Sequence, residues 1–491
     1  MEFIENTRYY MWEKNCAVKW LTVLVFEILL AGLFIISPLS VIIFLAAAAA
    51  LLILFTKPEY SLYILVLLII PGRVATFTFG EVRLLIPQLL VGVVLFYWIV
   101  ARLTKTRPPF TSTGINQPLL IFWAWALLSL LWSHNRIVGL EDILTLSSSV
   151  VLVFLITAFI NKPKTLCIVL GIFIFMGFID AIIAFASTYT NYVFQETWTF
   201  LKSSDLTLRF WHKHYGRSVG GRCMGFQAPH GTAVTLSFAI TFCMMFFLTT
   251  WKKKKRMILM GIALFLFTIT VGTLTKSMII SILSGTAYIV LHLKPIRRRL
   301  FTSLFVILML AITAFALTRF QQGVGLTALR VVEAVKVQSD EMKSTSMGDR
   351  LKISAIGLQK LRETGGLGTG IGGFLHYTPY KHMDGSHPSI LWDLGFVGIA
   401  LWIWLLTAAF RLFVTAIKNS NNEYYRRMLI VYMGGYVSVL ISWFFTYAYA
   451  DIYLWFYLGI GFALVHLSRT VPFDPNLRLP YSGNGESIVI I

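Results

Sequence analysis

His387 is the residue whose place in the sequence best suits acid–base chemistry. It lies directly before an apolar segment that begins with Pro388 and is long enough to cross a membrane. An unperturbed imidazole has a pKa of about 6.5, so a neutral ring at the mouth of a span could take a proton from a sugar hydroxyl. The same ring could instead cap the helix or hydrogen-bond the glycine-rich turn before it, and both interpretations stay open.

Two arginines are placed where they could hold a phosphate group. Arg222 lies in the small-residue loop 220–226 beside an apolar segment, so its guanidinium could reach inward and bind phosphate through two donors. Arg350 lies in the first turn of a predicted helix that begins at Ser346 or Asp349 as cap and continues to about Arg362, and there a basic side chain opposes the helix dipole. That position indicates a ligand-directed role. Most other basic residues of these loops are explained as solvated surface.

Metal and nucleotide chemistry find little support in the sequence. The glycine-dense turn 365–373 has neither a strand before it nor a Lys-Ser/Thr pair after it, so it predicts a hinge or a close backbone approach and not a phosphate loop. The histidines of the two long loops lack an HExxH pattern or an acidic cluster, and no DxD motif is present. We therefore expect no metal and no cofactor.

The elements that position these residues are apolar helices. Of the 491 residues, 57% are hydrophobic and 13% are charged, and the mean hydropathy is +0.75, which excludes a soluble protein. The predicted fold class is an all-α polytopic integral membrane protein with about 14 transmembrane helices and two long external loops, the second containing short amphipathic helices. The spans are expected near 18–37, 39–56, 59–76, 84–102, 117–132, 143–160, 166–188, 231–250, 257–273, 277–293, 300–318, 389–416, 428–447 and 451–467.

Basic residues in the short connections set the expected orientation. If the N-terminus is cytoplasmic, the connections with the most basic residues fall inside; they contain Lys57, 102–107, 162–164, 252–256, 294–299 and 426–427. The net charge of +20 therefore indicates membrane topology and an anionic ligand, and not a nucleic acid. The expected organisation is N-terminal transmembrane helices over 1–188, external loop 1 over 189–230, central transmembrane helices over 231–319, external loop 2 with catalytic elements over 320–388, C-terminal transmembrane helices over 389–467 and a cytoplasmic tail over 468–491.

Taken together, the order and spacing of these elements over about 217–400 resemble the O-antigen ligase and lipid-linked polysaccharide polymerase family, bacterial membrane glycosyltransferases of the GT-C-like type. The matching elements are Arg222 to His230, Thr273 to Ser277, Arg350 heading a helix, the turn 368–373, and His387 with the Leu-x-x-Leu-x-x-x-Gly pattern after it. Two positions depart from the family pattern: Lys276 stands where Arg is usual, and His230 stands where Asn is usual.

The resemblance implies that a glycan on undecaprenyl pyrophosphate is transferred to an acceptor hydroxyl at the outer leaflet. It implies that His387 is the general base of an inverting, metal-independent displacement, that Arg222 and Arg350 hold the pyrophosphate, and that Lys276 and Arg217 assist. The expected location is the bacterial cytoplasmic (inner) membrane, with the active site facing the outside or periplasm.

The acceptor separates two reactions within this family, and a transporter is an alternative of a different class. A polymerase, which we favour, extends a lipid-linked repeat unit, and it could work with a chain-length regulator protein. A ligase transfers the glycan to lipid A core. A flippase or transporter stays open, although the spans show no internal repeat and the charged residues cluster in the outer loops. The expected partners are the lipid-linked donor, a glycan or lipid A core acceptor and membrane lipids, with no nucleic acid.

Overall fold

A computed structural model describes a large part of the chain. The described residues are 58–73, 75–79, 82–103, 114–190, 198–202, 206–210, 225–226, 229–250, 252–273, 275–293, 346–377, 385–444 and 451–470. The chain divides into two compact units, Met1–Ser61 and Leu62–Ile491. Only the first turn of helix α3 is described in the first unit, so the account below concerns the second.

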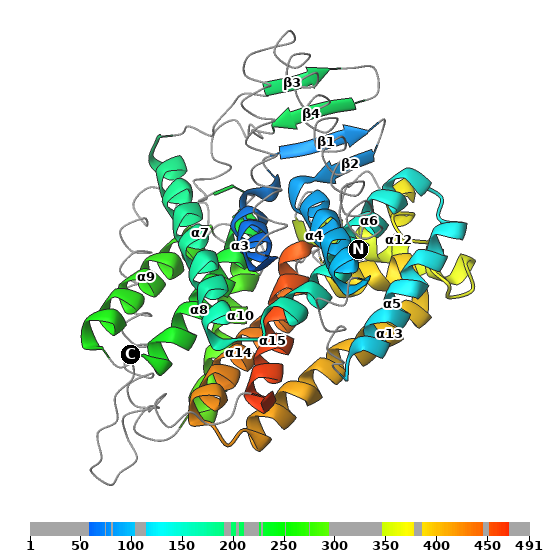
Figure 1. Ribbon diagram of the computed structural model, residues 1–491. Helices are drawn as coiled ribbons and strands as arrows, with labels where there is room; N and C mark the ends of the chain where they lie inside the picture. The colour runs from blue at the N-terminus through cyan, green and yellow to red at the C-terminus, as the bar shows by residue number, and fades with distance from the viewer. Residues whose placement is uncertain are drawn as a thin grey trace, which may run out of the picture. The chain divides into compact units, whose positions relative to one another are not determined.

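Helices make up most of the described residues (Figure 1). They are α3 (Pro58–Ile69), α4 (Ile86–Leu103), α5 (Asn116–Ser129), α6 (Arg136–Phe159), α7 (Pro163–Thr190), α8 (Pro229–Thr249), α9 (Lys253–Gly272), α10 (Lys276–His292), α12 (Ser346–Glu363), α13 (Ser386–Asn419), α14 (Glu423–Ser442) and α15 (Ile452–Thr470). Short 3-10 turns are η1 (Pro71–Arg73), η2 (Leu130–Trp132) and η4 (Phe374–Tyr377).

Seven of the described helices are long and apolar enough to cross a membrane: α4, α6, α7, α8, α9, α13 and α15. This agrees with the predicted multi-pass helical protein. Each predicted span that falls on described residues overlaps a helix. The spans predicted at 18–37, 39–56 and 300–318 lie outside the described residues, so the total of about 14 stays a prediction.

A small antiparallel sheet accompanies the helices. Its strands are β1 (Ala75–Phe79), β2 (Val82–Leu85), β3 (Trp198–Lys202) and β4 (Leu206–Phe210), in the order β2-β1-β4-β3. The expectation of an all-α fold thus holds for the helices but omitted this sheet. The reason is that β1 pairs with β4, from Ala75 opposite Phe210 to Phe79 opposite Leu206, across a long stretch of sequence. This pairing holds the connection between α3 and α4 against the connection between α7 and α8.

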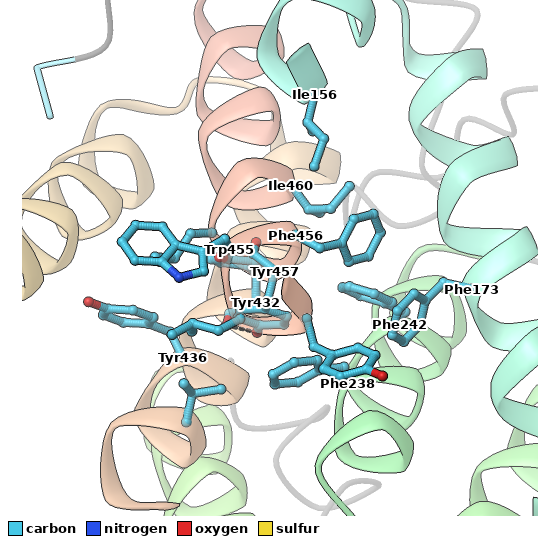
Figure 2. Packing of buried hydrophobic residues seen from close by; sticks show 14 of the residues in the cluster. Ile156, Phe173, Phe238, Phe242, Tyr432, Tyr436, Trp455, Phe456, Tyr457 and Ile460 are labelled. Carbon is cyan, nitrogen blue, oxygen red and sulfur yellow. Dashed lines mark hydrogen bonds between the residues drawn. The ribbon is translucent and has the colours of Figure 1, made fainter. Parts of the chain in front are cut away.

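Aromatic rings form the centre of the helical packing, where α14 and α15 meet α7 and α8 (Figure 2). The rings of Tyr432 and Tyr457 stack with centroids 4.5 Å apart, and each hydroxyl donates to the other residue's backbone carbonyl, at 2.8 and 2.7 Å. Phe456 stacks on Phe173 at 5.0 Å. Because each hydroxyl donates to a carbonyl, these tyrosines can be fully buried without leaving a polar atom unpaired.

Small residues allow a second close contact, between α10 and α14. A Cβ atom placed on Gly434 would lie 2.7 Å from the carbonyl oxygen of Gly285, and one placed on Gly285 would collide with the backbone of Gly434. Close backbone approach at small residues is how helices pack in a membrane, where no water is released by apolar contact.

Candidate functional site

Helix α13 is broken close to its N-terminal end. Gly395 has φ 70° and ψ −165°, which no residue of an α-helix adopts. The break separates the first turns, 386–394, from the long segment that follows, and it removes the helical partners of several backbone groups. Within a membrane such groups need other partners, because lipid offers none.

The glycine-rich segment 365–373 supplies most of those partners. The amides of Thr369 and Gly370 donate to the carbonyls of Trp392 and Asp393, both at 2.9 Å. The amide of Phe396 donates to the carbonyl of Gly366, also at 2.9 Å. From α5, the indole nitrogen of Trp125 donates to the carbonyl of Leu394 at 3.0 Å. Backbone and indole donors therefore replace the lost helical hydrogen bonds.

The glycines are needed because the chains lie too close for side chains. A Cβ on Gly368 would lie 2.6 Å from the carbonyl oxygen of Asp393, one on Gly370 the same distance from that of Ser129, and one on Gly372 the same distance from the amide of Gly139. All three glycines have positive φ, between 67° and 81°. The close backbone approach predicted from the sequence is confirmed.

His387 lies in the first turn of α13, half-buried and bonded through its ring. The indole nitrogen of Trp402 donates to His387 Nδ1 at 3.0 Å. A neutral ring with an accepting Nδ1 carries its proton on Nε2, which is then the nitrogen available for the second bond, to the backbone of Leu440 on α14. The ring also packs edge-on against Phe444, with centroids 4.5 Å apart. To accept a proton from a substrate, His387 must first give up one of these two bonds.

Helix α12 carries Arg350 and packs against the first turns of α13, residues 386–394, which we call the head of α13. Of the two predicted starts, Ser346 and Asp349, the structure has the first, and the helix ends at Glu363, one residue after the predicted end. Its apolar residues Ile353 and Leu361 pack with Phe374 and Trp392 in a small cluster of their own. This contact fixes α12 beside the first turns of α13.

Arg350 itself is placed by its backbone alone, as the fifth residue of α12. Lys276 is likewise placed by its backbone, as the first residue of α10. The side chains of both residues, and the whole of Arg222 and Arg217, lie outside the described residues. Of the five predicted site residues, His387 is therefore the one whose surroundings are described. Binding of the pyrophosphate by the other four residues stays a prediction.

Asp180 on α7 is a polar residue whose role the sequence did not reveal. Its carboxylate is fully buried and accepts from the amide of Phe226 at 2.6 Å and from the hydroxyl of Thr235 at 3.3 Å. Gly225 has no room for a side chain, since a Cβ there would collide with this carboxylate. Asp180 thus holds the 225–226 segment, three residues after Arg222, against α7 and α8. The available signal was a single acidic residue in an apolar span.

An exposed cluster of rings and charges lies next to the glycine-rich segment. His134 stacks on His376 with centroids 6.1 Å apart and meets Tyr377 edge-on at 5.3 Å. Lys360 Nζ lies 4.3 Å above the Tyr377 ring and bonds to Glu363 at 2.6 Å. The hydrogen bond from Lys360 holds the pKa of Glu363 below its usual range. In the described part of the chain, no three His, Cys, Asp or Glu residues are grouped to hold a metal ion.

No protein-family model matches the chain, and no curated protein is significantly similar to it in sequence.

Proposed function

We propose that the chain is a membrane glycosyltransferase that transfers a glycan from undecaprenyl pyrophosphate to an acceptor sugar hydroxyl. The reaction would take place at the outer face of the bacterial cytoplasmic membrane. The acceptor is a lipid-linked repeat unit, so the enzyme is a polysaccharide polymerase. Transfer to lipid A core, the ligase reaction, is the alternative that the experiment below separates.

The observation that carries this proposal is the broken head of α13. Interrupted membrane helices are where many membrane proteins bind polar substrates, because irregular backbone is tolerated at membrane depth only when it is buried in protein or lines a cavity. Here segment 365–373 bonds to the backbone at the break, and α12 packs on Trp392 just before it, at the same end of α13 as His387. The long basic loop predicted over 320–388 adjoins this end in the sequence.

The chemistry follows from the leaving group. The acceptor oxygen attacks the anomeric carbon and forms the new glycosidic bond, while the bond from that carbon to the pyrophosphate oxygen breaks with inversion. Arg222 and Arg350, assisted by Lys276 and Arg217, hold the departing pyrophosphate, which already leaves readily. His387 takes the acceptor proton after its ring releases the Trp402 donor, so binding of the acceptor is coupled to a change at this hydrogen bond.

The test is an assay of purified full-length protein with a defined lipid-linked repeat unit, with and without lipid A core. A polymerase forms a ladder on the lipid carrier alone, a ligase transfers only in the presence of core, and retention of an unaltered donor with vectorial movement overturns the enzyme proposal in favour of a transporter.

His387→Ala should lower transfer by about 10² to 10⁴ while donor binding persists. His292→Ala is the matched control, since that histidine lies at the far end of α10 and, among the described residues, its ring bonds to the carbonyl of Tyr288 in its own helix. Activity of the unchanged protein should also fall as the pH drops through ionisation of the imidazole, because a protonated ring accepts no proton. Equal activity in the two variants would remove His387 from the mechanism.

A further inference from the structure

A basic groove lies at the end of α13 away from His387. It has a volume of about 290 Å³ and is lined by one face of α13 together with Gly114 before α5 and Arg469 at the end of α15. The α13 residues that line it recur at helical spacing. They are Trp404, Thr407, Ala408, Arg411, Leu412 and Thr415.

Two positive charges in this groove lack acidic partners among the described residues. Arg411 and Arg469 are both exposed. Every described ion pair uses Glu363 or Glu423, and neither arginine takes part in one. A guanidinium is always charged in a protein and binds phosphate through two parallel donors, so two of them in one groove form a site for a phosphate group.

The depth of the groove suits a lipid. At 1.5 Å per residue, Arg411 lies about 12 Å along the helix from its end at Asn419, and Trp404 lies about 10 Å further from that end. In the predicted span 389–416, Arg411 lies five residues from the cytoplasmic end, so its guanidinium can reach the membrane surface while its stem stays in apolar surroundings. The groove therefore offers cations at the headgroup level and a Trp, Ala and Thr surface running toward the bilayer interior.

We propose that this groove binds an anionic phospholipid, with its headgroup phosphate on Arg411 and Arg469 and one acyl chain along Ala408 and Trp404. Basic pockets between membrane helices bind acidic lipid headgroups in this way. The site lies at the opposite end of α13 from the proposed catalytic residues, in the leaflet that the predicted topology makes cytoplasmic. It does not depend on the proposed glycan transfer.

The experiment is native mass spectrometry of the full-length protein from lipid nanodiscs containing phosphatidylglycerol, cardiolipin or phosphatidylcholine. The unchanged protein should retain phosphatidylglycerol or cardiolipin and lose phosphatidylcholine. Arg411→Gln combined with Arg469→Gln should weaken this retention at least about tenfold, because each charge-assisted hydrogen bond that is lost removes a large part of the binding free energy. Arg136→Gln is the matched control, because it removes an exposed arginine at the other end of the bundle.

Two further arms identify the source of the phosphate and guard against misfolding. Trp404→Ala should weaken retention of long-chain phosphatidylglycerol and leave binding of a dihexanoyl analogue unchanged, whereas inorganic phosphate should not compete. Arg411→Lys keeps the charge and should lose less affinity than Arg411→Gln at an unchanged melting temperature. Unaltered acidic-lipid retention in the double variant, equal retention of phosphatidylcholine, or full competition by inorganic phosphate would overturn the proposal.

Discussion

The head of α13 and the aromatic centre of α14 and α15 are held together in opposite ways. At the head of α13, backbone groups bond to backbone groups, and Gly368, Gly370 and Gly372 leave no room for a Cβ. In the aromatic centre, large rings fill the space between helices and tyrosine hydroxyls bond to carbonyls. The head of α13 should therefore be destabilised when atoms are added, and the aromatic centre when atoms are removed.

Truncation in the aromatic centre should have the largest effect. Phe456→Ala removes a fully buried ring that stacks on Phe173, and the cavity left behind should cost about 3 to 5 kcal/mol of unfolding free energy. Phe175→Ala on α7 is the control, because that ring is 58% exposed and should change little. Thermal unfolding of the purified proteins in one detergent measures both. Similar melting temperatures for the two variants would contradict the assignment of the core.

Addition of one methyl group should be the next largest effect. Gly368→Ala places a Cβ 2.6 Å from Asp393 O at a φ of 79°, so collision and strain together should cost about 3 kcal/mol. Gly365→Ala separates the two causes, since its φ is 61° but nothing lies within 4 Å of the added atom. The control should lose only about 1 to 2 kcal/mol, as left-handed strain alone costs. Equal melting temperatures of Gly368→Ala and Gly365→Ala would show that the close backbone approach does not require glycine at position 368.

Loss of a single hydrogen bond should lower the unfolding free energy less than either of these changes. Trp402→Phe keeps a ring but removes the donor to His387 Nδ1, and should cost about 1 kcal/mol. Nitrogen NMR of labelled histidine should show a share of the Nδ1-protonated form of His387, because the bond to Leu440 is then the one described bond that favours the Nε2-protonated form. An unchanged tautomer in this variant would mean that Leu440 alone sets it.

The smallest effect concerns the exposed pair on α12. The bond from Lys360 lowers the pKa of Glu363, so its contribution to stability is present above the ordinary glutamate pKa and is lost as the pH falls through the lowered value. Lys360→Ala should return the Glu363 pKa upward, as a carboxyl titration followed by NMR would show, and added salt should weaken the difference. No shift in that titration would mean that the pair does not persist in solution.

The sequence predicted what is decided locally. Apolar spacing located the helices, and the end of α12 was predicted to within one residue because its apolar face lies within one segment. Its start was left open between Ser346 and Asp349, because both are residue types that cap helices. The glycine density of 365–373 also predicted a close backbone approach, but it did not show which segment the backbone approaches.

What the sequence did not reveal depends on partners far away along the chain. The β1–β4 pairing, the bond from Phe226 to Asp180 and the break at Gly395 each join segments whose proximity no local pattern records. Gly395 in particular looks like any glycine in an apolar helix until the donors of Thr369 and Gly370 are seen beside it.

The broken turn of α13 has a consequence for how the protein is made. Every donor that satisfies its freed carbonyls, from Trp125, Thr369 and Gly370, lies earlier in the chain than the carbonyls themselves. A ribosome adding about 5 to 20 residues per second completes segment 365–373 one to several seconds before Gly395. The interrupted helix thus enters a membrane in which its partners have already been synthesised, and its exposed backbone need never wait in lipid for a segment still to be translated.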